Sequence, residues 1–253
     1  MIRIATGLVC ALISWFPAVA MVGGAQPSSE GAGRAVVMLT GSRGTFCSGV
    51  AIARDLVLTA AHCVLPGADY KLVEFDAARR PALEDVAAIV RHPDFDVHAV
   101  QRHRVTADVA LLKLVTPRRT RPATLAPAGG AVAPGDRFVV AGYGVAVRGD
   151  GKSGGTVRAA TLAAIGQPGT LQIRLADPLT NGERPGLGAC TGDSGAPVYR
   201  EIAGALAVIG VVSWSTGPAL SDGCGGLTGV TPLARYRGWL TGQAAKMGSP
   251  LPR

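Results

Sequence analysis

Short apolar runs separated by turn residues constrain the fold of this chain more than any other feature. Residues 48–52 and 56–60 flank the polar pair Arg54-Asp55, a pattern that predicts a β-hairpin. The 35 glycines and 17 prolines interrupt the sequence too often for long helices, and a closing helix is predicted only over 235–247. Further strands are predicted at 36–39, 109–115, 137–141, 171–175, 197–200 and 205–214. The chain is therefore predicted to be mostly β.

The first twenty residues (1–20) have the pattern of a secretion signal. Arg3 precedes an apolar run that ends in the small-x-small triplet Ala-Val-Ala at 18–20. A retained membrane anchor is the alternative, but the run is at the short limit for a span and contains Pro17. Attachment of a lipid at Cys10 is disfavoured because little apolar sequence precedes it. We therefore expect a cleaved signal, a secreted or periplasmic protein and no stable membrane anchor.

Removal of the signal leaves an even number of cysteines, which in a secreted chain predicts two disulfides. A zinc site is the alternative, but these cysteines lack the close C-x₂-C pairs of such sites. The 24 basic side chains left after loss of Arg3 exceed the 17 acidic ones, yet they are scattered and not interleaved with aromatic residues. Nucleic acid is therefore not an expected partner. The cysteines are Cys47, Cys63, Cys190 and Cys224.

Three short segments each carry a reactive side chain beside small residues or before an apolar run. A serine hydroxyl is a poor nucleophile, so hydrolysis needs a base to take its proton and a carboxylate to orient that base. Each segment alone has an ordinary structural explanation, such as a turn or the start of a strand. Together they supply His, Asp and Ser in one chain order, separated by 46 and 86 residues. The segments are Thr59-Ala60-Ala61-His62-Cys63, Asp108-Val109-Ala110-Leu111-Leu112 and Gly192-Asp193-Ser194-Gly195.

On these residues the chain resembles the chymotrypsin-like, trypsin-fold secreted serine proteases. The sequence Met-Val-Gly-Gly at 21–24 looks like the family's mature start, and Ser213-Trp214 and the segment through Trp239 also match. The resemblance implies an all-β fold of two antiparallel six-stranded β-barrels with a C-terminal helix. The barrels would comprise 21–122 and 123–253.

The same resemblance implies a monomeric serine endopeptidase that uses an acyl-enzyme intermediate, with no cofactor and no metal. Its expected partners are protein or peptide substrates and a protein protease inhibitor. His62 is the expected general base, Asp108 its orienting carboxylate and Ser194 the nucleophile. The N–H groups of Gly192 and Ser194 would form the oxyanion hole.

The resemblance also assigns the cysteines and the N-terminus. Cys47 would pair with Cys63 and fix the turn that carries the base, while Cys190 would pair with Cys224 across the substrate pocket. In this family the new N-terminal amine pairs with the Asp before the nucleophile. Here the amine of Met21 would pair with Asp193, so that signal cleavage itself would activate the protein.

The specificity pocket is expected to be neutral. Its floor by resemblance is Gly188, so no carboxylate is present to pair with a substrate Arg or Lys, and an apolar or small P1 residue is predicted. Asp222, before Cys224, is the alternative source of a negative charge. The other expected pocket residues are Ala189, Ser213, Trp214, Ser215, Gly225 and Gly226.

Two loops near the cleft are expected to be surface features. Residues 92–108 form an extended hydrophilic loop in which His98 and His103 have no assigned role. The loop at 70–85 looks shortened relative to a calcium loop of some relatives, and we do not expect calcium at Glu74 or Glu84.

Three other interpretations are weaker. Residues 146–153 match a relaxed P-loop pattern, but two glycines follow where a helix would have to continue. A lipase or esterase of another fold is disfavoured because the context of Ser194 is not G-x-S-x-G and Ser follows His and Asp. A non-catalytic binding protein on the same scaffold remains an alternative, which a fluorophosphonate label on Ser194 would distinguish.

Overall fold

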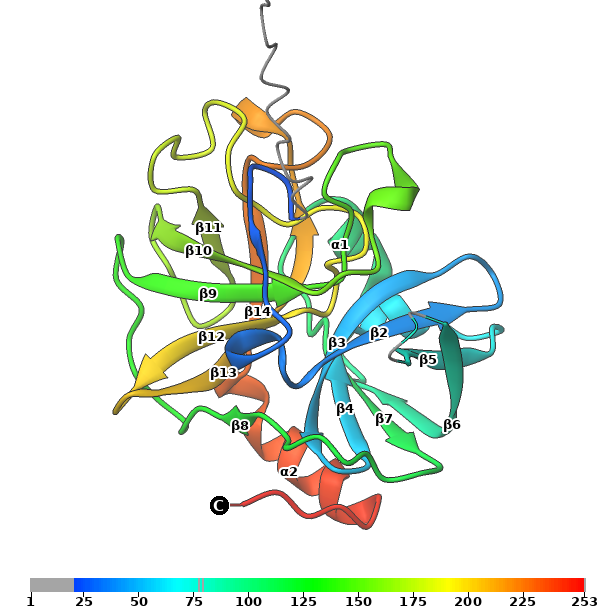
Figure 1. Ribbon diagram of the computed structural model, residues 1–253. Coiled ribbons are helices and arrows are strands. Elements are labelled where there is room, and N and C mark those ends of the chain that lie inside the picture. Colours follow the sequence, from blue (N-terminus) through cyan, green and yellow to red (C-terminus); the bar gives the residue numbers. More distant parts are fainter. Residues whose placement is uncertain (1–20, 77, 79, 253) are drawn as a thin grey trace, which may run out of the picture.

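The computed structural model describes residues 21–76, 78 and 80–252. The expected signal segment lies outside these residues. Within them, two closed antiparallel barrels of six strands each lie side by side, and a C-terminal helix packs beneath them (Figure 1). The expected all-β, two-barrel fold is confirmed.

The first barrel closes in the order β2-β3-β4-β7-β6-β5. The predicted hairpin is present as its β3 and β4, in which Val50 lies opposite Leu58. Leu72 of β5 and Leu112 of β7 are fully buried in the barrel's own core, because alternate side chains of each strand point inward. The strands are β2 (Val36–Gly41), β3 (Phe46–Ala53), β4 (Leu56–Thr59), β5 (Tyr70–Phe75), β6 (Pro81–Arg91) and β7 (Ala110–Leu114).

The second barrel closes in the order β9-β10-β11-β14-β13-β12, with β12 pairing back to β9. Two short strands join it from outside: β1 (Gln26–Pro27) pairs with β10, and β8 (Thr124–Leu125) pairs in parallel with β13. The N-terminal segment therefore packs on the second barrel before the chain enters the first. The strands are β9 (Arg137–Gly142), β10 (Arg158–Ile165), β11 (Ile173–Ala176), β12 (Pro197–Ile202), β13 (Ala205–Ser215) and β14 (Thr228–Pro232).

Each barrel has its own apolar core, and a third buried cluster joins the two. This shared cluster includes Val50 and Leu111 of the first barrel and Val211 of the second. The predicted closing helix is α2 (Arg237–Lys246), and it adds Leu240 and Ala244, which lie on one face because they are four residues apart. Burial of a leucine contributes about 1.5–3 kcal/mol, so the cluster holds the barrels together.

Five short 3-10 turns and one further short helix complete the described secondary structure. No helix in the described residues is both long and apolar enough to cross a membrane. The helix α1 (Val97–Gln101) interrupts the expected 92–108 loop. The turns are η1 (Gly31–Gly33), η2 (Ala61–Val64), η3 (Gly151–Ser153), η4 (Pro218–Leu220) and η5 (Ala234–Tyr236).

Candidate active site

His62 and Asp108 meet at one end of the first barrel. His62 lies in η2, directly after β4, and Asp108 lies just before β7. The antiparallel pairing of Thr59 with Ala110 brings these two ends together. His62 N donates to Asp108 Oδ1 at 3.0 Å, and His62 Nδ1 lies 2.8 Å from Asp108 Oδ2. The carboxylate therefore holds both the backbone and the ring of the histidine.

The second barrel supplies another donor to the same carboxylate. Ser213 of β13 donates its hydroxyl to Asp108 Oδ2 at 2.5 Å. The Asp108 side chain is fully buried, whereas the His62 side chain is 20% exposed. With Nδ1 directed at Asp108, Nε2 is the ring nitrogen left for exchange of a proton with a partner in the cleft.

The loop that carries Ser194 depends on two glycines with positive φ. At Gly192 (φ +95°) a Cβ would lie 2.3 Å from the Phe46 ring, and at Gly195 (φ +78°) one would lie 2.1 Å from Thr59 Oγ1. A side chain at either position would push the loop away from the first barrel. These contacts show that the loop is pressed against the barrel that carries the histidine.

Two backbone N–H groups of this loop are left for a ligand. The N–H groups of Asp193 and Gly195 donate to Cys190 O and Val212 O at 3.0 and 2.7 Å. The N–H groups of Gly192 and Ser194, each of which directly precedes one of these two donors in the chain, have no acceptor among the described residues. Alternation of this kind leaves a pair of donors for an oxyanion.

Ser194 and His62 line one cavity of about 570 Å³. No hydrogen bond joins the Ser194 hydroxyl to His62 within the described part of the chain, which is common in sites before substrate binds. Apart from His62, the single charged lining residue of this cavity is Arg148. The other lining residues are Thr45, Phe46, Cys47, Cys190, Thr191, Gly192, Ser215, Gly223 and Cys224.

Ser48 of β3 ties the loop that carries Ser194 to the first barrel. Its backbone N–H donates to Ser194 O at 2.8 Å, and its hydroxyl donates to Gly192 O at 2.8 Å. The same hydroxyl accepts from Tyr143 N at 2.9 Å. Ser48 is fully buried, so this small hub fixes the distance between the barrels. The sequence analysis missed it, because a lone serine in a strand carries no signal.

The structure forms both expected disulfides. Cys47–Cys63 closes a separation of 16 residues and anchors η2 to β3, and Cys190–Cys224 closes a separation of 34 residues beside the cavity. In the chain-entropy account a loop of the shorter length contributes about 3 kcal/mol. Both bridges therefore stabilise the walls of the site.

Asp193, which precedes Ser194 in the chain, is fully buried. Its carboxylate accepts from Gly144 N at 2.9 Å and from Cys190 N at 3.0 Å, and no cation of the described chain pairs with it. Burial raises the pKa of Asp193 to about 7, although the two backbone hydrogen bonds oppose the rise. Met21 is also fully buried, in the same cluster as Ala189 and Ala196.

The expected pocket residues divide into two groups. Ser215 lines the cavity, whereas the other six are not among its lining residues. Ala189 N donates to the hydroxyl of Thr228, which is fully buried and absent from the expected set. Gly226 N donates to Thr216 O at 2.9 Å. Gly188 lies against Gly225, so closely that a Cβ on Gly188 would be 3.1 Å from Gly225 Cα.

The 92–108 segment reaches the second barrel. Asp96 caps α1 by accepting from His98 N at 2.8 Å. His103 adopts a φ of +52°, and its ring stacks on Trp214 with 4.7 Å between centroids and 20° between planes. The segment was expected to be only a surface loop, and the stacking was not predicted.

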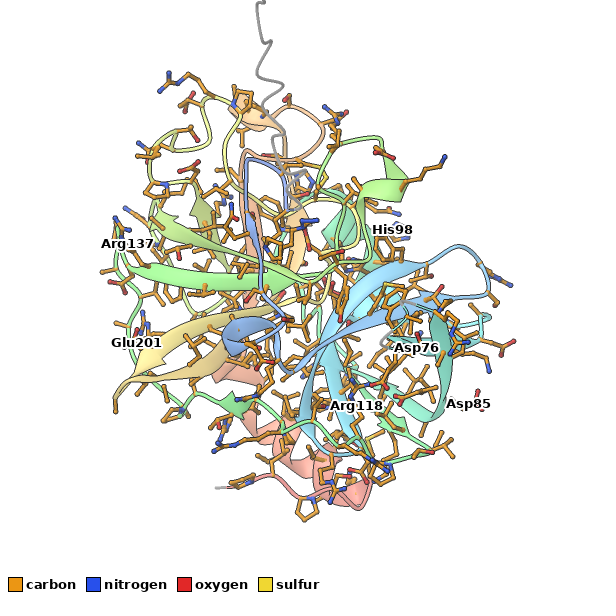
Figure 2. The ribbon with its side chains drawn as sticks, viewed as in Figure 1. Asp76, Asp85, His98, Arg118, Arg137 and Glu201 are labelled. Carbon is orange, nitrogen blue, oxygen red and sulfur yellow. A yellow bond between two sulfur atoms is a disulfide. The ribbon has the colours of Figure 1, made fainter. Side chains whose placement is uncertain are left out.

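The 70–85 segment was expected to be a loop. Its residues instead form most of a hairpin made by β5 and β6. Lys71 lies opposite Asp85, and the strands fill positions that the resemblance had assigned to a loop. Arg118, labelled in Figure 2, forms ion pairs with both Glu74 and Glu84. One guanidinium therefore bridges these two carboxylates and balances one of their two negative charges.

Comparison with known proteins now identifies the chain. Residues 22–240 match the family Trypsin. The chain belongs to the trypsin family. This membership makes it a trypsin-family serine protease, and the two barrels with a cleft between them are the fold expected of that family.

Individual relatives are more distant. The chain is 27% identical over 186 residues to a trypsin of Phaedon cochleariae, covering 67% of this chain and 68% of that protein. It is 31% identical over 234 residues to human serine protease 56, covering 82% of this chain but 36% of the relative. The mouse serine protease 56 is 31% identical over 225 residues, covering 78% and 34%. The chain thus spans about a third of the length of the serine protease 56 proteins.

Proposed function

We propose that this trypsin-family protease cleaves peptide bonds with Ser194 as nucleophile, His62 as general base and Asp108 as the carboxylate that orients the base. The observation that carries the proposal is the hydrogen-bonded His62–Asp108 pair at a cavity shared with Ser194. In this mechanism the Asp108 carboxylate stabilises the imidazolium that forms.

In the first half of the reaction, Ser194 Oγ attacks the substrate carbonyl carbon while its proton passes to His62 Nε2. The carbonyl π electrons move to oxygen, and the N–H groups of Gly192 and Ser194 donate to that oxyanion. When the tetrahedral intermediate collapses, the C–N bond breaks. His62 then gives its proton to the leaving amine, and Ser194 remains acylated.

In the second half, a water molecule takes the place of the amine. His62 removes its proton, the hydroxide adds to the acyl carbon, and collapse returns the proton to Ser194 Oγ. The free acid leaves and the resting enzyme is regenerated.

The cavity supports cleavage after an apolar or small P1 residue, because none of its described lining residues is acidic. Gly188 and Ala189 offer no carboxylate, and Asp222 is exposed and is not a lining residue of the cavity. A substrate cation would therefore be desolvated without a partner. Rates on Arg, Phe and Ala p-nitroanilides test this, and a preference for Arg would contradict it.

We further propose that the protein is exported and that removal of residues 1–20 frees the amine of Met21 to pair with Asp193. The buried Met21 and the unpaired, buried carboxylate support this step. The mature monomer would divide into 21–122 and 123–253, and a protein inhibitor would fill its cleft. Met-Val-Gly-Gly at the N-terminus of secreted active protein is the expected result, and full activity with a longer N-terminus would contradict it.

The decisive test compares the wild type with Ser194→Ala on a peptide library and with a fluorophosphonate label. The wild type should cleave peptides and take the label at Ser194, and the variant should do neither. An enzyme that has lost a triad member can still exceed the rate in water by about 10³–10⁴-fold. The assay must therefore be able to measure a decrease in kcat/KM of at least a hundredfold. A wild type that folds but neither reacts nor cleaves would support a binding role.

A further inference from the structure

Arg148 lies at the mouth of the catalytic cavity, on the loop between β9 and η3. Its guanidinium rests on Gly223, where a Cβ would lie 2.5 Å from Arg148 Cζ. Gly223 has a φ of +131°, and its carbonyl accepts from Ser215 Oγ at 3.2 Å. Because Gly223 has no side chain, the guanidinium of Arg148 can lie directly against its backbone. We call this backbone surface of Gly223 the seat of Arg148.

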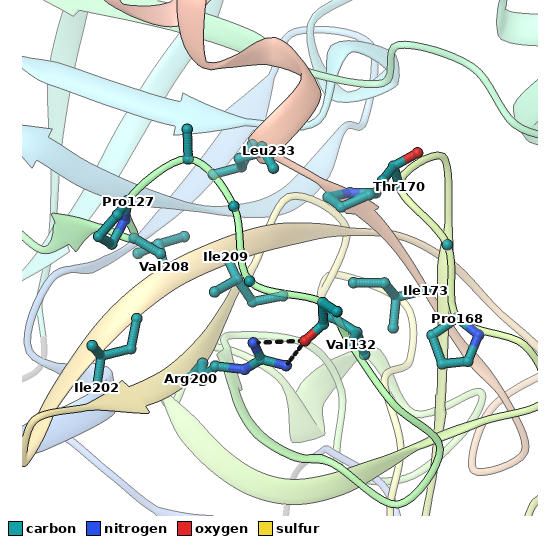
Figure 3. Close-up of a pocket in the computed structure, with 18 residues that line it drawn as sticks. Pro127, Val132, Pro168, Thr170, Ile173, Arg200, Ile202, Val208, Ile209 and Leu233 are labelled. Carbon is teal, nitrogen blue, oxygen red and sulfur yellow. Dashed lines mark hydrogen bonds between the residues drawn. The ribbon is translucent and has the colours of Figure 1, made fainter.

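This guanidinium has no acceptor in the described chain, neither a carboxylate nor a hydrogen-bonding oxygen. Arg200, which lines an apolar cavity of about 490 Å³ in the second barrel, shows the contrast (Figure 3). Arg200 donates twice to Ala131 O and pairs with Asp136 at 2.7 Å. One arginine is satisfied inside the protein, and the other presents its donors to the cleft.

We propose that Arg148 is a specificity-determining residue that binds the carboxylate of an acidic substrate side chain at P3. The inference rests on the proposed peptidase function and adds a preference outside the neutral P1 pocket. The Arg-Gly-Asp triplet at 148–150 thereby has a use in this site. Its Asp150 is occupied locally, since it accepts from Lys152 N at 3.0 Å.

The position follows from the geometry of an extended peptide. The carbonyl that Ser194 attacks belongs to P1, so the P1 side chain enters the cavity between Cys190 and Ser215. Side chains two residues apart in a strand point to the same side, about 6.6–6.8 Å apart. The P3 side chain therefore lies on the same side of the peptide as the cavity that Arg148 lines, and the P2 side chain points to the opposite side.

Arginine suits this role because its planar fork accepts a carboxylate in a bidentate arrangement. Asp222, next to Gly223 in the chain, is the nearest acidic residue in sequence to this seat, and it forms no ion pair with a residue that the structure describes. Its replacement by Asn should therefore leave the preference intact.

The test uses two pairs of p-nitroanilide peptides with the same neutral P1 residue, one pair with Glu or Gln at P3 and one with Glu or Gln at P2. For the wild type, Glu at P3 should raise kcat/KM about threefold to fivefold over Gln, as for a solvent-exposed ion pair. The ratio should fall to about one in Arg148→Gln. It should also fall in the wild type at high salt, because screening weakens exposed pairs.

Lys152→Gln is the matched control. It removes one positive charge from the same segment, but Lys152 does not line the cavity, so its P3 ratio should equal that of the wild type. An unchanged ratio in Arg148→Gln, or an equal gain from Glu at P2 and P3, would overturn the inference. If the wild type cleaves none of the peptides, the proposed function fails instead, which separates the two outcomes.

Discussion

Two carboxylates beside the cleft are equally buried and differently partnered. Asp108 accepts three hydrogen bonds, two from His62 and one from Ser213. Asp193 accepts two, both from backbone N–H groups, and its pKa is raised to about 7. The two carboxylates are therefore equally buried, but only Asp108 has side-chain donors.

The comparison assigns different tasks to the two groups. Asp108 is complete before any processing, because both barrels already donate to it. Asp193 is enclosed by Gly142 and Gly144 but has no cation, so in the unprocessed chain its charge costs free energy. On the proposed mechanism the first carboxylate would orient the base, and the second would pair with the new positive charge at the N-terminus.

Asp108→Asn should cause the largest loss of activity, because it replaces the carboxylate that holds His62. An amide in this place favours the wrong tautomer of His62, so kcat/KM should fall by about 10⁴-fold. Steady-state rates on a neutral p-nitroanilide provide the measurement, and Asp222→Asn, which removes an exposed acid, is the control that should keep its rate. A loss smaller than tenfold would show that Asp108 does not orient the base.

The pH dependence of the free energy of unfolding should reveal the raised pKa of Asp193. Its pKa is raised on folding, so between about pH 4 and 7 the native state binds more protons than the unfolded state, and stability falls as pH rises through that window. At about 1.4 kcal/mol per pKa unit, a Ser194→Ala form that retains residues before Met21 should lose a few kcal/mol.

Urea denaturation at several pH values tests this prediction. Asp193→Asn should flatten the slope in the longer form, because the titrating group is gone. A Ser194→Ala form that starts at Met21 should lack the fall, since the amine would then stabilise the carboxylate. The same slope in all three proteins would contradict the assignment of the titration to Asp193.

Gly144→Ala should disturb the enclosure of Asp193 without changing any charge. The added methyl would lie 2.4 Å from the carboxylate carbon, and overpacking of this kind costs about 1–3 kcal/mol. Thermal unfolding gives the measurement, with Gly151→Ala as control, because a Cβ there meets no atom within 4 Å. Equal melting temperatures for the two variants would show that the site has room.

Ser213→Ala should have the smallest effect, because it removes one of the three donors to Asp108 and leaves His62 bonded. A hydrogen bond to a charged group contributes about 1.5–3 kcal/mol, and partial replacement by the remaining donors should limit the loss in kcat to about tenfold. The KM for small substrates should stay within about twofold. A loss as large as that of Asp108→Asn would mean that Ser213 is essential to the geometry.

The sequence was sufficient for the parts of the site that depend on residue identity and chain order. His62, Asp108 and Ser194 stand in short distinctive segments, and the hairpin of β3 and β4 has clear alternation and a turn. The strand β10, with the sequence RAATLAAI, was missed because its many alanines give no period. Arg148 was assigned no role because its seat, Gly223, lies 75 positions away in the chain. Contacts of that range depend on the assembled fold.

The hub at Ser48 has a consequence for how this enzyme would fail. His62 and Ser194 belong to different barrels, so on the proposed mechanism the rate of turnover depends on the alignment of the two barrels as well as on the integrity of each. A low concentration of denaturant that shifts one barrel relative to the other would abolish activity while the circular dichroism spectrum stayed native. Inactivation should then precede unfolding, and return of activity on dilution should be fast, because only docking has to be repeated.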